Sequence, residues 1–298
     1  MKIFAIIVTY NGMKWLERTL NSLRASSVPL TPIVVDNNSS DGSADFVKKN
    51  YPEAVVFQQD KNLGFGQANN VGFRYALEND ADFVMLLNQD ASIEKDALKF
   101  MLEANDGVSM ISPVHLNGDG TKLDGSFENS MLQSGNGFVE DYNANHCKPI
   151  YKTKEVCAAC WLMPISVIET IGGFNPLFFH YGEDNNYLQR LEYHKLEINV
   201  VSKAFICHDR EELFGNKNAF YKKWVYRMML IIAADINLTW RMRMKAYYRL
   251  LKDCYFARLS RGHYVFGMFF VAGIKILSQS GKISFSKQQE RQKKANWL

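Results

Sequence analysis

The sequence predicts an α/β fold built on a mainly parallel, Rossmann-like sheet flanked by helices. Over residues 1–110, short apolar runs alternate with amphipathic stretches, which is the pattern of βαβ units. Two of these runs end in acidic motifs, because Ile33–Val35 leads into Asp36 and Phe83–Leu87 leads into Asn88-Gln89-Asp90. Ligands bind at the carboxyl ends of parallel strands, so we expect these acids to face one crevice.

Periodicity and turn residues place the individual elements. Apolar runs predict strands at Ile3–Thr9, Ile33–Asp36, Ala54–Gln58, Phe83–Leu87, Val156–Pro164 and Glu197–Val201. Apolar residues at helical spacing and helix-start signals predict helices at Lys14–Ala25, Ser43–Asn50, Gly66–Glu78, Ser166–Ile171 and Asp184–His194. Residues 113–150 are rich in Gly and Asn with weak periodicity, and we expect loops and short antiparallel strands there. Residues 220–280 are expected to be mainly helical.

Charge is divided unevenly along the chain. Residues 222–298 hold 16 Lys/Arg and 3 Asp/Glu, a net of +13, whereas residues 1–221 hold 19 and 28, a net of −9. We therefore predict a globular domain over residues 1–219 and a basic, helical extension over residues 220–298. A segment with this charge favours an anionic membrane surface or another polyanion as its partner.

The extension is not expected to cross a membrane. Its most apolar run, from Tyr264 to Leu277, has 14 residues and includes Lys275, whereas a spanning helix needs about 20 apolar residues. Helices lying on the membrane surface would place basic side chains against anionic headgroups and aromatic side chains in the interface. The alternative is a packing appendage or an oligomer contact, because apolar stripes usually form cores.

Five cysteines are too few and too irregularly spaced for a disulfide framework. Cys157 and Cys160 have CxxC spacing, but no second pair follows, which argues against a zinc site. We interpret the cysteines as mostly buried thiols of a protein in a reducing cytosol.

Five motifs stand in order along the chain: Val8-Thr9-Tyr10-Asn11, Val34–Ser43, Asn62–Asn70, Leu86–Asp90, and Gly172-Gly173-Phe174-Asn175 through Phe179 to Glu183-Asp184. This set resembles family 2 glycosyltransferases, which have the GT-A fold, over about residues 3–215. Within that family it looks most like bacterial enzymes of the rhamnosyltransferase type, which build surface polysaccharides.

The resemblance implies an inverting transfer of a sugar from a nucleotide-diphosphate donor, either dTDP-rhamnose or a UDP-sugar. The implied acceptor is a saccharide, typically lipid-linked, and the implied cofactor is Mg²⁺ or Mn²⁺. Together with the basic extension, this places the protein in the cytoplasm, peripherally bound at the inner face of the cell membrane.

The donor site implied by the resemblance gathers residues from four motifs. Asp36 would bind the nucleobase edge, since a carboxylate accepts well from an imide N–H; the alternative is a helix-capping acid. Glycines before a helix start let backbone approach an anionic ligand. The donor-binding set is Thr9, Tyr10, Asn11, Asp36, Asn38, Asn62, Gly64, Asn69, Asn88, Gln89 and Asp90.

Asn88-Gln89-Asp90 occupies the place of the family's DxD motif, with Asn88 instead of the first acid. By the resemblance, Asp90 ligates Mg²⁺ or Mn²⁺ and His208 is a second ligand. Hard cations take oxygen ligands and often combine few carboxylates with substrate phosphates, and imidazole can bind Mn²⁺. The alternatives are a β-turn that ends an apolar strand and a structural histidine.

The resemblance places the chemistry at Glu183-Asp184, where an inverting transfer needs a base for the acceptor hydroxyl. Asp184 would be that base and Glu183 would support it. The alternative is a pair of ordinary acids that complement the dipole of the helix they begin. Cys160 and Trp161 lie where the family's acceptor pocket is lined, and Trp161 could stack on a sugar or belong to the core.

Two other classes of protein share some of these sequence features. A sugar-phosphate nucleotidyltransferase would need a Gly-rich, basic loop after the first strand, which Thr9–Lys14 does not provide. A nucleic-acid-binding protein could use the basic extension, but acids in the crevice argue against it, so no nucleic-acid partner is expected.

Overall fold

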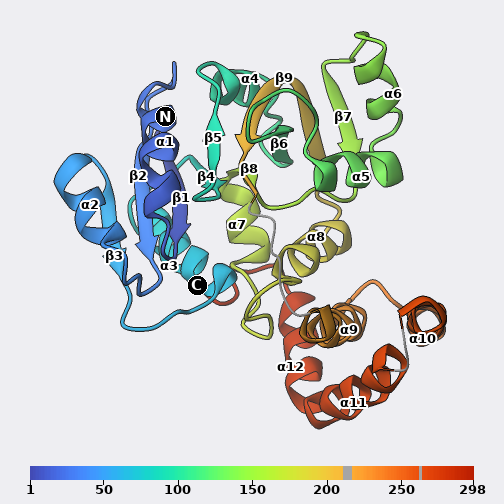
Figure 1. The fold of residues 1–298 in the computed structure, drawn as a ribbon. Coiled ribbons are helices and arrows are strands. Elements are labelled where there is room, and N and C mark those ends of the chain that lie inside the picture. The colour runs from blue at the N-terminus through green and yellow to red at the C-terminus, as the bar shows by residue number, and fades with distance from the viewer. Residues whose placement is uncertain (211–216, 262–263) are drawn as a thin grey trace.

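The computed structural model describes residues 1–210, 217–261 and 264–298, and a mixed sheet of nine strands organises them (Figure 1). The strand order is β3-β2-β1-β4-β8-β6-β9-β5, and β7 pairs with β9. The first four strands are parallel, β8 is antiparallel to both β4 and β6, and β6 and β9 are parallel. The strands are β1 Ile3–Thr9, β2 Thr31–Asp36, β3 Val55–Gln58, β4 Phe83–Leu87, β5 Ala91–Ile93, β6 Met110–Asn117, β7 Ile150–Thr153, β8 Cys160–Pro164 and β9 Ile198–His208.

The helices α1, α2 and α3 lie within two residues of their predicted bounds, whereas α4 was not predicted. After α7, α8 begins with Glu183 and Asp184, and α9, α10, α11 and α12 make up the extension. The helices are α1 Met13–Arg24, α2 Ser43–Asn50, α3 Phe65–Glu78, α4 Ala97–Glu103, α5 Gly125–Ser134, α6 Phe138–Asn143, α7 Ile165–Ile171, α8 Glu183–Tyr193, α9 Lys217–Ala234, α10 Trp240–Arg261, α11 Tyr264–Ser278 and α12 Ser280–Glu290.

Both faces of the parallel strands are buried, which explains why these strands are apolar throughout. Along β1, Ile3, Ala5 and Ile7 face a cluster that includes side chains of α1, α2 and α4. Phe4 and Ile6 face the other cluster, which includes side chains of α3, α7 and α8. Side chains of a strand alternate between faces, so one strand serves both cores.

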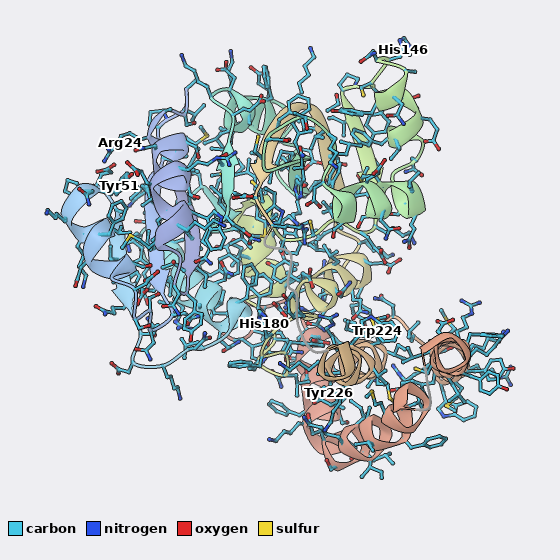
Figure 2. The ribbon with its side chains drawn as sticks, viewed as in Figure 1. Arg24, Tyr51, His146, His180, Trp224 and Tyr226 are labelled. Carbon is cyan, nitrogen blue, oxygen red and sulfur yellow. The ribbon has the colours of Figure 1, made fainter. Side chains whose placement is uncertain are left out.

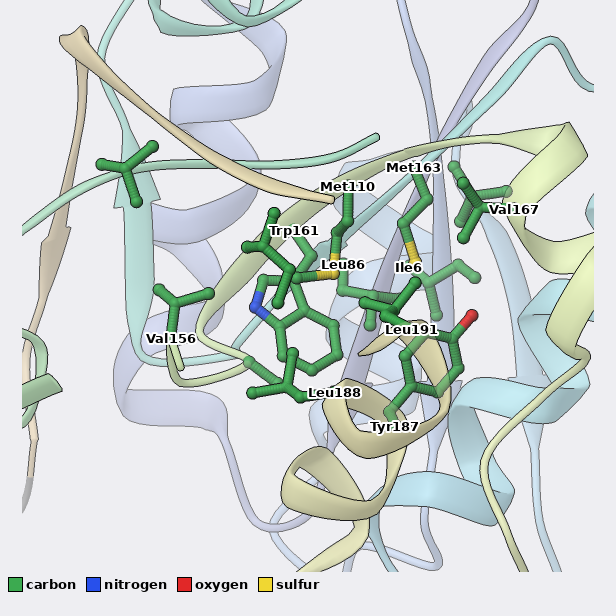
Figure 3. Close-up of a cluster of buried hydrophobic side chains, with 14 of the residues drawn as sticks. Ile6, Leu86, Met110, Val156, Trp161, Met163, Val167, Tyr187, Leu188 and Leu191 are labelled. Carbon is green, nitrogen blue, oxygen red and sulfur yellow. The ribbon is translucent and has the colours of Figure 1, made fainter. Parts of the chain in front are cut away.

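Trp161 lies inside the second of these clusters. Its side chain is fully buried, and its ring contacts those of Phe174 and Tyr187. Figure 3 shows it among Val156, Leu188 and Tyr187. Cys160, the preceding residue in β8, is also fully buried, and burial raises the pKa of its thiol. This corrects the prediction that Cys160 and Trp161 line an acceptor pocket, because neither presents a surface to an acceptor; the core interpretation of Trp161 applies.

The prediction for residues 113–150 was wrong. This region contains most of β6 and two helices, α5 and α6, instead of loops and short antiparallel strands. Asp124 caps α5 by accepting hydrogen bonds from the backbone N–H groups of Ser126 and Phe127, at 3.0 Å each. Phe127, Met131 and Phe138 are the buried side chains that fix the two helices. The predicted strand over Val156–Pro164 begins only at Cys160.

The extension forms its own hydrophobic cluster around α9, which includes Val225, Met229 and Ile276 and also contacts Phe178. Trp224 and Tyr226, labelled in Figure 2, lie on α9 and pack against this cluster. Among the described residues, no helix combines the length and the apolar character needed to cross a membrane.

The chain then returns to the α/β domain. The Gly173 N–H donates to the Asn296 carbonyl (2.9 Å), and the C-terminus lies beside α3 and α7 in Figure 1. The predicted boundary at residues 219/220 falls inside α9, and the division into two domains there stays a prediction.

Candidate active site

The motifs that follow β1, β2 and β4 meet at the carboxyl ends of these strands. The parallel register pairs Thr9 with Asp36, which brings the motifs after these two strands to one edge. Gln89, after β4, joins them, because its Oε1 accepts from Thr9 Oγ1 (2.8 Å) and from the Tyr10 N–H (3.0 Å). Asn11 ties the first two motifs together, donating its backbone N–H to Ser39 Oγ (2.9 Å).

Asp36 is fully buried, and only one of its carboxylate oxygens is paired. Oδ2 accepts from the Ser39 N–H (3.1 Å), whereas Oδ1 has no hydrogen-bond partner within the described ranges. Asp36 does not cap α2, since Asp41 accepts from the Ser43 N–H there (3.0 Å). An unpaired buried carboxylate oxygen is costly, and an added N–H donor would remove that cost.

The loop before α3 is held by Asn37, a residue that the sequence analysis did not assign to the site. Asn37 Nδ2 donates to the Gly64 carbonyl (3.3 Å), and its Oδ1 accepts from the Leu63 N–H (2.9 Å). Asn62 Oδ1 accepts from the Gly64 N–H (2.8 Å). Asn37 could have been found from its position directly after Asp36. A polar side chain is needed there to hydrogen-bond the backbone of the loop beside the strand end.

Gly64 has a φ of +78°, and a Cβ at this position would collide with the carbonyl oxygen of Phe179. A Cβ on Gly66 would lie 2.8 Å from Phe174 Cβ and 3.5 Å from Glu183 Cβ. Both glycines are therefore required where this loop meets the segment that leads into α8. The contact brings the acid pair to the donor loop.

Two predicted donor residues lie outside this contact. Asn38 is exposed and has a φ of +67°, which fits a turn. Asn69 is buried within α3 and donates from Nδ2 to the Phe65 carbonyl (3.0 Å). Their roles in donor binding stay predictions.

Asp90 and His208 converge, as the metal prediction requires. Asp90 Oδ1 lies 3.3 Å from His208 Nε2, and Asn88 Nδ2 lies 3.4 Å from the same nitrogen. The Asp209 N–H donates to the Asp90 carbonyl (2.8 Å), which joins the end of β9 to the turn after β4. No group of three or more His, Cys, Asp or Glu side chains arranged to hold a metal occurs among the described residues.

A carboxylate and an imidazole facing each other fit Mn²⁺ or Mg²⁺ when phosphate oxygens and waters complete the coordination. Asp124, which the sequence analysis missed, supports this pair. Its Oδ2 accepts from Arg210 Nε (2.6 Å) and lies 3.7 Å from His208 Nδ1. Burial acts to raise the pKa of Asp124, but the hydrogen bond and charge of Arg210 prevail, and the pKa is below its usual value. The separation of 3.7 Å is too long for a hydrogen bond, and His208 Nδ1 has no hydrogen-bond partner among the described residues.

The acid pair begins α8. Glu183 is buried, and its Oε2 has no partner in the parts of the chain that the structure describes. Burial, and secondarily the charge of Asp184, raise the pKa of Glu183 to about 7. Burial also raises the pKa of Asp184, whose Oδ1 accepts from the Asn185 N–H (2.8 Å). A raised pKa suits a group that must accept a proton near neutral pH.

The parallel strands β3-β2-β1-β4, continued by the antiparallel strand β8, form the mixed sheet of the GT-A fold. The chain belongs to glycosyl transferase family 2, whose profile matches residues 4–168. It is thus a glycosyltransferase, and this family favours neither the nucleotidyltransferase nor the nucleic-acid-binding alternative.

Known relatives agree with this assignment. The chain is 24% identical over 260 residues to the N-acetylglucosaminyl-diphospho-decaprenol L-rhamnosyltransferase of Mycobacterium tuberculosis, covering 79% of this chain and 85% of that protein. The S. aureus TarS 1–349 structure in complex with UDP-GlcNAc aligns with a TM-score of 0.62 and 17% identity, covering 98% and 88%. The mannosyltransferase PcManGT from Pyrobaculum calidifontis, in complex with GDP-Man and Mn²⁺, aligns with a TM-score of 0.60 and 15% identity, covering 97% and 84%.

The acid pair leads to a pH-dependent prediction. The folded protein keeps the Glu183 proton up to about pH 7, whereas the unfolded chain loses it near the ordinary pKa of 4.5. The folded state therefore loses stability as the pH rises through this window, and the full cost remains above it. We expect Glu183→Gln to remove a cost of about 3 kcal/mol at pH 8 and little at pH 4.

Urea unfolding at both pH values measures this difference. Glu169→Gln, which alters an exposed acid on α7, is the matched control and should change nothing. An equal effect of Glu183→Gln at pH 4 and pH 8 would show that Glu183 is not a destabilised buried acid.

Proposed function

We propose that the protein is an inverting glycosyltransferase that moves a sugar from dTDP-rhamnose or a UDP-sugar to a lipid-linked saccharide acceptor in cell-surface polysaccharide synthesis. The observation that carries the proposal is the acid pair Glu183-Asp184, which lies against the Gly64–Gly66 loop of the donor crevice. A base beside a nucleotide-sugar site is what this transfer needs. The names of the rhamnosyltransferase and TarS relatives support the two donor classes.

In this proposal, Asp184 takes the proton of the acceptor hydroxyl as its oxygen attacks the anomeric carbon. The bond from that carbon to the phosphate oxygen breaks, and the nucleoside diphosphate leaves from the opposite face. Glu183 supports Asp184, and its buried position keeps the pair out of bulk water. Asp36 offers its unpaired Oδ1 to an N–H of the nucleobase.

Asp90 and His208 would hold Mg²⁺ or Mn²⁺, and the bound cation would neutralise charge on the leaving diphosphate. Asn88 contributes no charge, so the donor phosphates would supply much of the attraction for the cation. Tyr10 and Gln89 would line the nucleotide side of the same crevice.

We also propose that the extension binds an anionic membrane surface. Phe270, Val271, Ile274 and Leu277 form an exposed apolar face of α11, and the last two are 70% and 73% exposed. Ala272 and Ile276, on the other side of α11, are buried against the extension. Because α11 is apolar on both sides and only one side packs against the extension, its exposed side can enter the apolar part of a membrane. Lys275 and Lys282 are exposed beside it, where they can meet anionic headgroups.

Asp184→Asn tests the base. It keeps the size of the side chain and removes the proton acceptor, so turnover should fall by about 10²–10⁴-fold. The dissociation constant of the nucleoside diphosphate should barely change, because the base contacts the acceptor. Turnover and donor affinity are measured on the same preparation, beside Glu183→Gln, which should be milder. Near-normal turnover of Asp184→Asn would exclude Asp184 as the base.

Asp90→Ala tests the cation site. We expect nucleoside diphosphate to bind more tightly with Mn²⁺ than with EDTA in the original protein, and Asp90→Ala to abolish this difference and turnover. Calorimetric titration measures the affinity. Asp96→Ala, at an exposed acid before α4, is the control and should keep the Mn²⁺ effect. An undiminished Mn²⁺ effect in Asp90→Ala would remove Asp90 from the site.

The double change Ile274→Glu and Leu277→Glu tests the membrane face. It places two acids on the exposed face of α11, so sedimentation with phosphatidylglycerol vesicles at low salt should be lost, and high salt should weaken binding of the original protein. Leu132→Glu, at an exposed apolar residue of α5, should leave binding intact. If the original protein does not sediment with these vesicles at low salt, the exposed face of α11 is better explained as a packing or oligomer contact.

A further inference from the structure

The end of the chain places a carboxylate against the helix that carries the acid pair. Glu290, at the end of α12, is 1% exposed. Its Oε1 accepts from Asn175 Nδ2 (2.6 Å), in the segment before α8, and from Asn186 Nδ2 (2.8 Å), in the first turn of α8. The Glu290 carbonyl accepts from His194 Nε2 (2.8 Å), at the other end of α8. One residue of the extension thus binds both ends of this helix.

A buried arginine strengthens the same contact from within α8. Arg190 is fully buried and donates to the carbonyls of Ile171 (2.6 Å) and Gly173 (2.7 Å). Its guanidinium lies over the rings of Tyr187 (4.7 Å) and Trp297 (4.9 Å), and Trp297 belongs to the last residues of the chain. The C-terminal residues therefore close over a charge in the middle of the helix.

Burying the charges of Glu290 and Arg190 costs free energy unless each charge is paired and hydrogen-bonded. The charges of Glu290 and Arg190 attract each other and offset part of their burial. Glu290 Oε2 has no hydrogen-bond partner in the described part of the chain, so one oxygen carries two hydrogen bonds while the other carries none. Removing the carboxylate would leave the buried Asn186 amide without its acceptor, whereas Asn175 Nδ2 would keep its hydrogen bond to Ser286 Oγ (2.6 Å).

We propose that Glu290 is a positioning residue, through which the C-terminal segment 283–298 fixes α8 and thereby the place of Asp184 in the crevice. An isolated helix of the length of α8 is marginal in water, so its placement must come from its packing partners. Asn186 lies only two residues after Asp184, and a misplacement of about 1 Å can cost about 10²-fold in rate. This inference rests on the proposed function for its kinetic readout alone.

Kinetics separate positioning from general stability. We expect Glu290→Ala to lower kcat at least about tenfold while the donor dissociation constant stays within about twofold. Glu290→Gln keeps an oxygen that can accept from both amides, so most of the turnover should return. Asp253→Asn, which removes an exposed acid of the extension, is the matched control and should keep full turnover.

An unchanged kcat in Glu290→Ala would overturn the proposal, as would an equal loss in Glu290→Gln. If Glu290→Ala does not fold, Asn186→Ala breaks one of the two hydrogen bonds and should lower kcat in the same direction with donor affinity kept. Full turnover of Asn186→Ala would then be the contrary result.

Hydrogen–deuterium exchange tests the same contact without any transfer reaction. We expect faster exchange in peptides from residues 183–193 of Glu290→Ala, with no change over residues 13–24 of α1, and original rates in Asp253→Asn. If the original protein transfers no sugar, the proposed function fails, but this experiment still decides whether Glu290 fixes α8. Unchanged exchange over residues 183–193 would refute the positioning role.

Discussion

Carboxylates collected at one edge of a buried sheet are the constraint on which the rest of this structure depends. Asp36, Asp90, Glu183 and Asp184 all belong to the strand-end crevice or to the segment against it. Asp36 and Glu183 are buried, and each has one carboxylate oxygen without a hydrogen-bond partner among the described residues. Such a buried oxygen is costly unless a hydrogen-bond donor, a cation or a proton compensates for its lost hydration. Glu183 meets this need with a pKa of about 7. Under the proposed function, the nucleobase N–H, a divalent cation and the acceptor's proton would meet these needs.

The scaffold holds these acids by hydrogen bonds between loops that are far apart in sequence. Gln89 joins the ends of β1 and β4, and Asn37 joins the end of β2 to the loop before α3. Gly64 and Gly66 then allow that loop to contact the segment before α8. Amides and glycines therefore make these joints without using the carboxylates of Asp90 or Glu183.

The first half of the fold could be predicted because its signals are local. β1, α2 and β4 follow from apolar runs and turn residues, and the acids at their ends follow from strand direction. The helices of residues 125–143 could not be predicted, since they depend on the Asp124 cap and on burial of Phe127 and Phe138 against distant strands. The roles of Arg210 and Glu290 could not be predicted for the same reason. Asp124 lies 86 residues from Arg210, and the partners of the Glu290 carboxylate, Asn186 and Asn175, lie 104 and 115 residues from it.

Asn88 shows how the sequence and the geometry together refine the metal proposal. The amide takes the place of the first acid of the DxD motif that the resemblance implies, and its Nδ2 lies 3.4 Å from the nitrogen of His208 that faces Asp90. A second carboxylate there would add repulsion with Asp90 in the absence of a cation, whereas an amide adds none. The pair Asp90 and His208 offers a cation one negative charge, so strong attraction requires the donor diphosphate. Cation and donor should therefore bind as one unit, and the site should favour the metal mainly when the nucleotide is present.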